Sequence, residues 1–178
     1  MSPASLLGPM TQICFAAIFV GTAKGALTHA LEYVKTKTRP WVLGGVNAAV
    51  EDPYILQQAG QMRAAVSAAE SLVYRAVTYI DHALTARESG AGEEAVRRRG
   101  EASVAVAEAK VFATEVALQV CQNIFRICGA RAALADEDFD RFWRDVRTLT
   151  LHDPVDYKER LIGAYLLQDQ FPPASFIT

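Results

Sequence analysis

The amino-acid sequence predicts an all-α protein, an antiparallel up-and-down bundle of three long helices and two short ones in a single domain, residues 1–178. Apolar residues recur with three- and four-residue spacing over three long stretches, which is typical of helices that bury one face or more. No stretch shows the two-residue alternation of a half-buried strand. Hydrophobic residues make up 51% of the 178 residues, which is enough to form a packed core.

The first long helix is expected over residues 5–35, and both of its sides are largely apolar. A helix of this kind needs neighbours on two sides. Arg39-Pro40 follows it and should end it, because proline disfavours the helical conformation in the residue before it. Residues 41–47, which include Gly44-Gly45, are expected to form a loop.

The second and third helices follow the same logic. Pro53 is suited to the first position of a helix that runs to Glu88, and the Ser-Gly-Ala-Gly run at 89–92 should end it. A charged linker then leads to a third helix that begins at about Glu101 and ends at Gly129, where a left-handed cap is expected. Its predicted packing seam repeats every seven residues and contains small side chains: Val104, Ala107, Val111, Thr114, Leu118, Cys121, Phe125 and Cys128.

Two short helices should complete the bundle. Asp136 or Asp138 can cap a helix over residues 139–147. The last helix is expected to open with Asp153 as N-cap and Pro154 at its first position, and to end before Pro172.

Composition excludes several classes of partner and site. The net charge of −2 gives no reason to expect nucleic acid or an anionic membrane. The only basic run, residues 97–99, is flanked by glutamates and fits a solvated helix start. Cys121 and Cys128 lie seven residues apart on one helical stripe, which favours buried thiols over a metal pair or a disulfide and suits a reducing cytoplasm. The apolar run 13–21 is too short to span a bilayer, so no membrane segment is expected.

Residues 144–154 read Arg-Asp-Val-Arg-Thr-Leu-Thr-Leu-His-Asp-Pro. This run resembles the R-[DN]-x-R-T-x-T-L-H-D-P segment in the C-terminal domain of the acyl-CoA dehydrogenase superfamily, in its dibenzothiophene monooxygenase-like flavin monooxygenase branch. The resemblance implies the helical C-terminal domain of a larger flavoenzyme, whose N-terminal helical domain and middle β-domain are not in this sequence. The domain would contribute part of the flavin and substrate site and the oligomer interface.

The resemblance also implies roles for individual residues. His152 would lie over the reactive edge of the flavin, where an imidazole can donate a hydrogen bond and relay a proton. Asp153 falls near the position of the glutamate base of acyl-CoA dehydrogenases, although the N-cap role suits it better. Arg131, in Gly129-Ala130-Arg131, would lie near the flavin phosphate. Arg39 would reach a flavin across the subunit interface, and is equally suited to being a solvated charge at a helix end.

The function implied is that of a reduced-flavin monooxygenase, with two alternatives left open. One is an FAD-containing acyl-CoA dehydrogenase domain with Asp153 as base, and the other is a non-catalytic oligomerisation module. The cofactor is FMN or FAD, not retained by the isolated chain, which we expect to be inactive alone. A flavin reductase is a possible partner of the larger enzyme. The long two-sided helices predict a homodimer or homotetramer. Arg144-Asp145 is expected to form a structural ion pair, and Leu149 departs from relatives that have a second histidine at its position.

Overall fold

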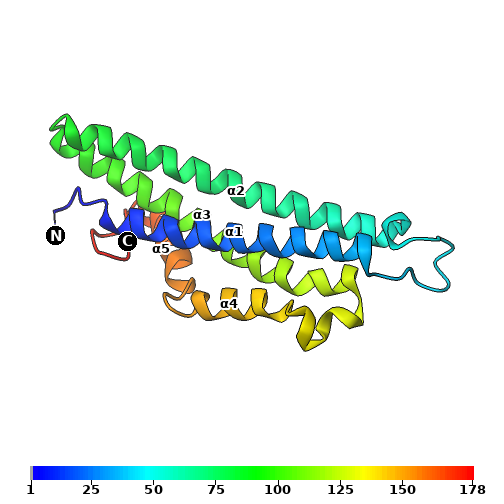
Figure 1. The fold of residues 1–178 in the computed structure, drawn as a ribbon. Helices are drawn as coiled ribbons and strands as arrows, with labels where there is room; N and C mark the ends of the chain where they lie inside the picture. The colour runs from blue at the N-terminus through cyan, green and yellow to red at the C-terminus, as the bar shows by residue number, and fades with distance from the viewer. Residues whose placement is uncertain (1) are drawn as a thin grey trace.

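A computed structural model describes residues 2–178, and within them it contains helices and turns but no strand. The predicted fold class is confirmed: three long helices run up, down and up, and two short ones pack along one side (Figure 1). The helices are α1 (Leu7–Thr36), α2 (Pro53–Glu88), α3 (Gly92–Cys128), α4 (Asp140–Thr150) and α5 (Asp156–Gln168), with 3-10 turns η1 (Ala49–Glu51), η2 (Ala130–Ala133) and η3 (Ala135–Glu137).

Helix α3 is the centre of the bundle, because α1, α2, α4 and α5 all pack against it. The three long helices meet through small side chains, which let their backbones approach closely and lose little rotamer freedom on burial. The buried alanines are Ala16, Ala23, Ala26 and Ala30 on α1, Ala69, Ala76 and Ala83 on α2, and Ala95, Ala102, Ala105, Ala107, Ala109, Ala113 and Ala117 on α3. The seam predicted for α3 is buried at Val104, Ala107, Thr114, Cys121 and Cys128 and half-buried at its other three positions, and the other buried alanines of α3 lie beside it.

The start of α3 differs from the prediction. The helix begins at Gly92 instead of Glu101, so the charged residues of the expected linker form its first turns. Glu94 accepts hydrogen bonds from Arg97 at 2.6 Å and Arg98 at 2.7 Å, and Glu101 pairs with both arginines one turn later. Pairs with this spacing stabilise a helix. The prediction that the basic run 97–99 is a solvated helix start is right for Arg97 and Arg98 but wrong for Arg99, whose guanidinium is buried against the C-terminal tail.

The segments after α3 also correct the expected caps. Gly129 has the positive φ of a cap (80°), but its ψ of 177° is extended instead of left-handed helical. Neither Asp136 nor Asp138 caps α4, which begins at Asp140 without a side-chain cap. Helix α5 begins at Asp156, three residues after the expected N-cap at Asp153. The reason is that the Asp153 carboxylate binds two lysines instead of the backbone of α5.

The expected Arg144–Asp145 ion pair does not form. Arg144 instead pairs with Asp140, one turn earlier in α4, at 3.0 Å. This spacing aligns the two side chains on one helix face, whereas adjacent residues point in different directions.

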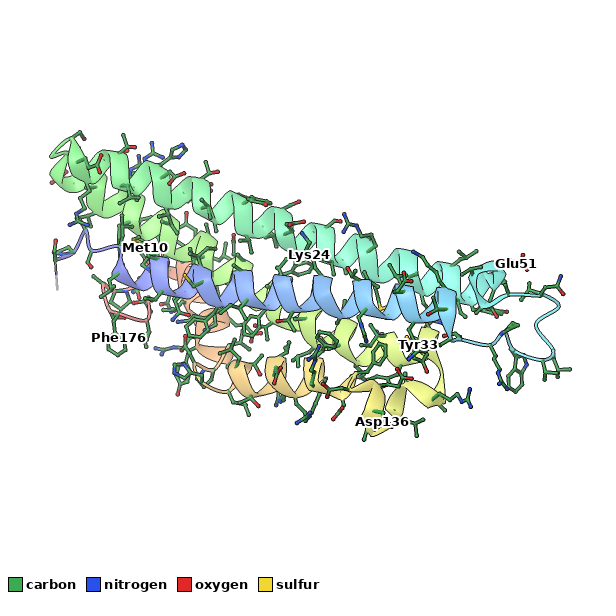
Figure 2. All side chains as sticks on the ribbon, viewed as in Figure 1. Met10, Lys24, Tyr33, Glu51, Asp136 and Phe176 are labelled. Carbon is green, nitrogen blue, oxygen red and sulfur yellow. The ribbon has the colours of Figure 1, made fainter. Side chains whose placement is uncertain are left out.

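The C-terminal residues 169–178 fold back onto the starts of α1 and α3. Arg99 is buried and its guanidinium donates to the carbonyl oxygens of Pro172, of Pro173 at 2.8 Å and of Thr178 at 2.6 Å. The Thr11 hydroxyl of α1 donates to the carbonyl of Phe176 at 3.1 Å. Figure 2 shows Phe176 beside the Met10 end of α1, so the two ends of the chain lie together.

Helix α1 is, by length and composition alone, long and apolar enough to cross a membrane, as the core helix of a soluble protein can also be. Here one face of α1 packs against α2 and α3. Its single mid-helix cation, Lys24, pairs with Glu70 of α2 at 2.6 Å.

Candidate functional site

His152 lies in the turn between α4 and α5, residues 151–155, and is exposed. Its backbone N–H donates to the carbonyl of Leu149 at 3.2 Å, which continues the last turn of α4. Its imidazole stacks on the ring of Phe15 in α1, with ring centroids 5.6 Å apart and planes inclined by 28°. The imidazole is therefore supported on one side by α1 and open to solvent on the other.

Asp153, the next residue, has the opposite environment. Its carboxylate accepts a hydrogen bond from Lys110 of α3 at 2.6 Å and pairs through the same oxygen with Lys158 of α5 at 3.2 Å. Both lysine side chains are only 3% exposed. The cavity beside the two ammonium groups measures about 10 Å³, no more than one water molecule requires. One carboxylate and two ammonium groups thus form a closely packed cluster inside the bundle.

The charges of this cluster shift the pKa values of its members. Burial raises the pKa of Asp153, but the hydrogen bond from Lys110 and the charges of both lysines outweigh it, so the pKa lies below its ordinary value. Burial lowers the pKa of Lys110, and the hydrogen bond to Asp153 only partly offsets this. At neutral pH the carboxylate is ionised and one of its oxygens is bound by both lysines, which leaves it a weak base.

A shallow groove of about 280 Å³ opens next to the cluster. It runs between α5 and the C-terminal tail, and its lining is mostly apolar: Asp153, Pro154, Tyr157, Lys158, Arg160, Leu161, Ile177 and Thr178. The exposed surface around the turn is therefore suited to a largely apolar ligand or to another protein surface.

Arg39 and Arg131 lie at the far end of the bundle, where α1 and α3 both finish. The two segments are held together by a hydrogen bond of 3.2 Å from the Thr38 hydroxyl to the carbonyl of Cys128. Both arginines are exposed. Arg39 lines a groove of about 490 Å³ together with Arg126 and Gly129, whereas Arg131 does not line it.

The two parts of the predicted site are thus far apart in one chain. Lys110 marks the level of His152 and Asp153, and Cys128 marks the level of the arginines. Eighteen residues of α3 separate them, which at 1.5 Å per residue is about 27 Å. Each part lies on its own region of the surface.

Lys110 and Lys158 were not among the predicted site residues, although the sequence contains a signal for the first. Lys110 is three residues after Ala107 and four before Thr114, so it lies on the predicted apolar seam of α3. A lysine on a buried stripe requires a partner, because an unpaired buried charge is costly. The sequence alone does not identify that partner, which is 43 residues away.

Two cysteines and one histidine, also candidates by residue type, pack against other residues of the bundle and have no chemical partner among the described residues that suggests a site. Cys121 and Cys128 are buried, and burial raises the pKa of each thiol to about 12. His29 packs against Phe139, with ring centroids 4.7 Å apart. Across residues 2–178, no three His, Cys, Asp or Glu side chains are grouped so that they could hold a metal ion.

Comparison with known proteins identifies relatives along nearly the whole chain. A dibenzothiophene monooxygenase from Mycolicibacterium goodii is 40% identical over 172 residues, which is 97% of this chain and 40% of the relative. A protein from Pseudomonas putida named probable FMNH2-dependent monooxygenase SfnC is 37% identical over 98% of this chain and 44% of its own length. The chain thus spans less than half the length of these curated relatives.

Solved structures agree with these relatives. The complex of the dibenzothiophene monooxygenase TdsC from Paenibacillus sp. A11-2 with FMN and indole superposes with a TM-score of 0.85 at 36% identity, over 96% of this chain and 42% of that one. Methanesulfinate monooxygenase MsuC from Pseudomonas fluorescens gives a TM-score of 0.90 at 35% identity, over 99% of this chain and 45% of that one. Residues 13–157 match the family model described as acyl-CoA dehydrogenase, C-terminal domain, and the chain belongs to that family.

Proposed function

We propose that residues 1–178 are the helical C-terminal domain of a larger reduced-flavin-dependent monooxygenase. The relatives named above are monooxygenases, and one of the solved relatives holds FMN. Reduced flavin supplies two electrons, so that one oxygen atom of O2 enters the substrate and the other leaves as water. The domain contributes His152 to this reaction and supplies faces for assembly.

The observation that carries the role of His152 is the contrast between two adjacent side chains. The imidazole is exposed and supported on Phe15, whereas the neighbouring carboxylate is only 13% exposed and is bound by two buried lysines. An open imidazole can donate a hydrogen bond and pass a proton at the pH of the cell. His152 is therefore the group at this turn that is available to a bound cofactor and substrate.

Arg39 and Arg131 are suited to bind the flavin phosphate, because exposed guanidinium groups make paired hydrogen bonds to phosphate oxygens. Their distance of about 27 Å along α3 from the level of His152 favours a site shared between copies of the chain. In this arrangement His152 of one copy and the arginines of another contact the same flavin. The chain by itself then holds flavin weakly, as its two partial sites are open to water.

An acyl-CoA dehydrogenase with Asp153 as base is disfavoured. A base that removes an α-proton needs a pKa near the working pH. The pKa of Asp153 is lowered and its carboxylate is already bound to Lys110 and Lys158. It has neither the basicity nor the free access that proton abstraction requires.

The test uses the full-length enzyme that contains this chain, supplied with reduced flavin and a sulfur-containing or aromatic heterocyclic substrate. We expect His152→Gln to lower the rate of oxygenated product about 10²- to 10³-fold, with hydrogen peroxide released in its place. The matched control is His82→Gln, at an exposed histidine of α2, which should leave the rate unchanged. An unchanged product rate in His152→Gln would remove this turn from the active site. Oxidation of an acyl-CoA that depends on Asp153 would establish the dehydrogenase instead.

A further inference from the structure

The ammonium group of Lys110 is unusual in having all three of its N–H donors engaged inside the bundle. It donates to the Gln12 side-chain oxygen at 2.8 Å, to the Asp153 carboxylate at 2.6 Å and to the Asp153 main-chain carbonyl at 3.2 Å. A lysine ammonium has three donors and no acceptor. The group is therefore saturated, and its position is fixed from three directions.

Two of these three bonds go to the residue that follows His152. Because Lys110 holds both the side chain and the main chain of Asp153, it restricts the backbone of the turn as well as neutralising a charge. The same ammonium lies 5.2 Å from the centroid of Phe15, the ring on which His152 stacks. Lys110 thus contacts both groups that define where the imidazole lies.

We propose that Lys110 is a positioning residue for His152, holding the imidazole through the Asp153 main chain on one side and the Phe15 ring on the other. The functional meaning of this position rests on the role proposed for His152 above. Burying an ammonium here costs free energy that an apolar side chain at the same place would not. What Lys110 provides in return is a fixed geometry of the turn that contains His152.

Lys158 provides an internal comparison. It is equally buried and pairs with the same carboxylate oxygen at 3.2 Å, but its other hydrogen bond goes to the carbonyl of Ile177 in the tail. Its ammonium group makes no hydrogen bond to the Asp153 carbonyl and no cation–π contact with the Phe15 ring, whereas that of Lys110 makes both. If neutralising Asp153 were the whole purpose of the cluster, the two lysines would be equivalent for His152. If Lys110 positions the imidazole, they are not.

The first experiment compares Lys110→Met with Lys158→Met in the full 178-residue chain labelled with ¹⁵N and ¹³C at histidine. The ring signals of His152 are assigned by their loss in His152→Gln. In the wild type we expect the chemical shifts of these signals to differ from those of the exposed His82. In Lys110→Met this difference should shrink by more than half. The backbone amide of His152 should exchange at least about tenfold faster. In Lys158→Met both readouts should stay near the wild type.

A triple variant, Lys110→Met with Asp153→Asn and Lys158→Met, covers the case in which the single variant unfolds. Because Asp153 pairs with both lysines, replacing all three leaves no buried charge without a partner, and such a replacement is often tolerated. The triple variant should therefore keep the His29 and His82 signals and still release His152. The proposal is overturned if folded Lys110→Met, or the triple variant, leaves His152 unchanged. It is also overturned if Lys158→Met moves His152 as far.

The second experiment measures the ratio of oxygenated product to hydrogen peroxide in the full-length enzyme. Lys110→Met should lower this ratio at least about tenfold, with the substrate KM changed by less than about threefold, and Lys158→Met should lower it less. A displaced imidazole with an unchanged ratio in both Lys110→Met and His152→Gln refutes the catalytic role of His152 and leaves the positioning intact. A reduced ratio in His152→Gln without displacement of the imidazole in Lys110→Met refutes the positioning alone.

Discussion

At the scale of single residues, the chemistry of this molecule is concentrated where two lysines enclose one aspartate. The surrounding core consists mainly of alanine, valine and isoleucine. Within it, removing the aspartate leaves two ammonium groups buried without a counter-charge. Asp153 therefore has a larger effect on the stability of the domain than its position in an exposed turn suggests.

The variant Asp153→Asn tests this effect on stability, because the stability difference from the wild type should depend on pH. A carboxyl group whose pKa is lower in the folded than in the unfolded state stabilises the fold above the unfolded pKa, near 3.8. This contribution is lost as the pH falls through the folded value. At pH 7 the variant should be less stable by about 3 kcal/mol, and the difference should shrink below about pH 4, because Asn resembles the protonated acid.

Urea unfolding at pH 7, 5 and 3 measures this difference. Asp145→Asn is the control, since the exposed Asp145 takes part in no ion pair among residues 2–178. A stability difference between wild type and Asp153→Asn that is the same at all three pH values would mean that the carboxylate charge contributes nothing.

The three cysteines should differ sharply in reactivity. Burial raises the pKa of Cys121 and Cys128 to about 12, so at pH 8 only about one such thiol in ten thousand is the reactive thiolate. Cys14 is exposed. With an aromatic disulfide reagent, at most one thiol per chain should react rapidly in the native protein, and three in denaturant. Cys14→Ser should abolish the rapid phase, and rapid reaction of a second thiol in the folded protein would contradict the buried placement.

At the scale of helices, the local sequence pattern predicted that each helix exists and in which direction it runs, but it did not predict every helix boundary. The three-four spacing of apolar residues correctly predicted the three long helices, and capping signals predicted the two short ones, although the expected caps do not form. The local pattern failed at residues 93–100, read as a charged linker, because opposite charges three and four residues apart, such as Glu94 with Arg97 and Arg98, stabilise these turns as helix. It failed again at Asp153, whose carboxylate binds Lys110, 43 positions earlier in the chain, and Lys158, five positions later, instead of capping the last helix. The first error overlooked ion pairs within the helix itself, whereas the second depends on the contact with Lys110, which no local window contains.

Gly100→Ala and Gly60→Ala form a matched pair of helix substitutions. A Cβ at Gly100 would overlap the Phe171 ring, whereas a Cβ at Gly60 in α2 would meet nothing within 4 Å. Gly100→Ala should therefore destabilise the chain by about 1–3 kcal/mol through overpacking. Gly60→Ala should stabilise it by up to about 1 kcal/mol.

Thermal or urea unfolding measures both variants. Destabilisation by Gly100→Ala should be absent when Phe171 is also replaced by alanine, since the ring is the group displaced. Equal effects of the two glycine substitutions would show that the tail does not pack as described.

At the scale of the whole molecule, several large apolar side chains are exposed in the loop between α1 and α2 and on α1. The loop between α1 and α2 exposes Trp41 by 67%, Val42 by 85% and Leu43 by 81%, and Ile18 on α1 is 51% exposed. The sequence could not place His152 relative to the arginines, because that separation depends on the length of α3 and on which copies of the chain meet.

We expect the chain to form a dimer or tetramer in which such faces are covered by another copy. Sedimentation velocity over a micromolar concentration range measures this. Ile18→Glu should shift the distribution toward monomer, because a charge in an apolar interface is costly. Gln57→Glu, at an exposed polar position of α2, should not. A wild-type chain that stays monomeric throughout would contradict the expectation.

The hydrogen bonds of Arg99 also determine the order in which the chain can finish folding. Its partners among residues 172–178 lie 73 to 79 positions downstream, and a ribosome releases them long after α1, α2 and α3 have emerged. Until then the guanidinium has no carbonyl oxygens from the tail to bind, and Lys158 lacks the carbonyl of Ile177. The three long helices can associate during translation, but the neighbourhood of His152 reaches its final form only afterwards.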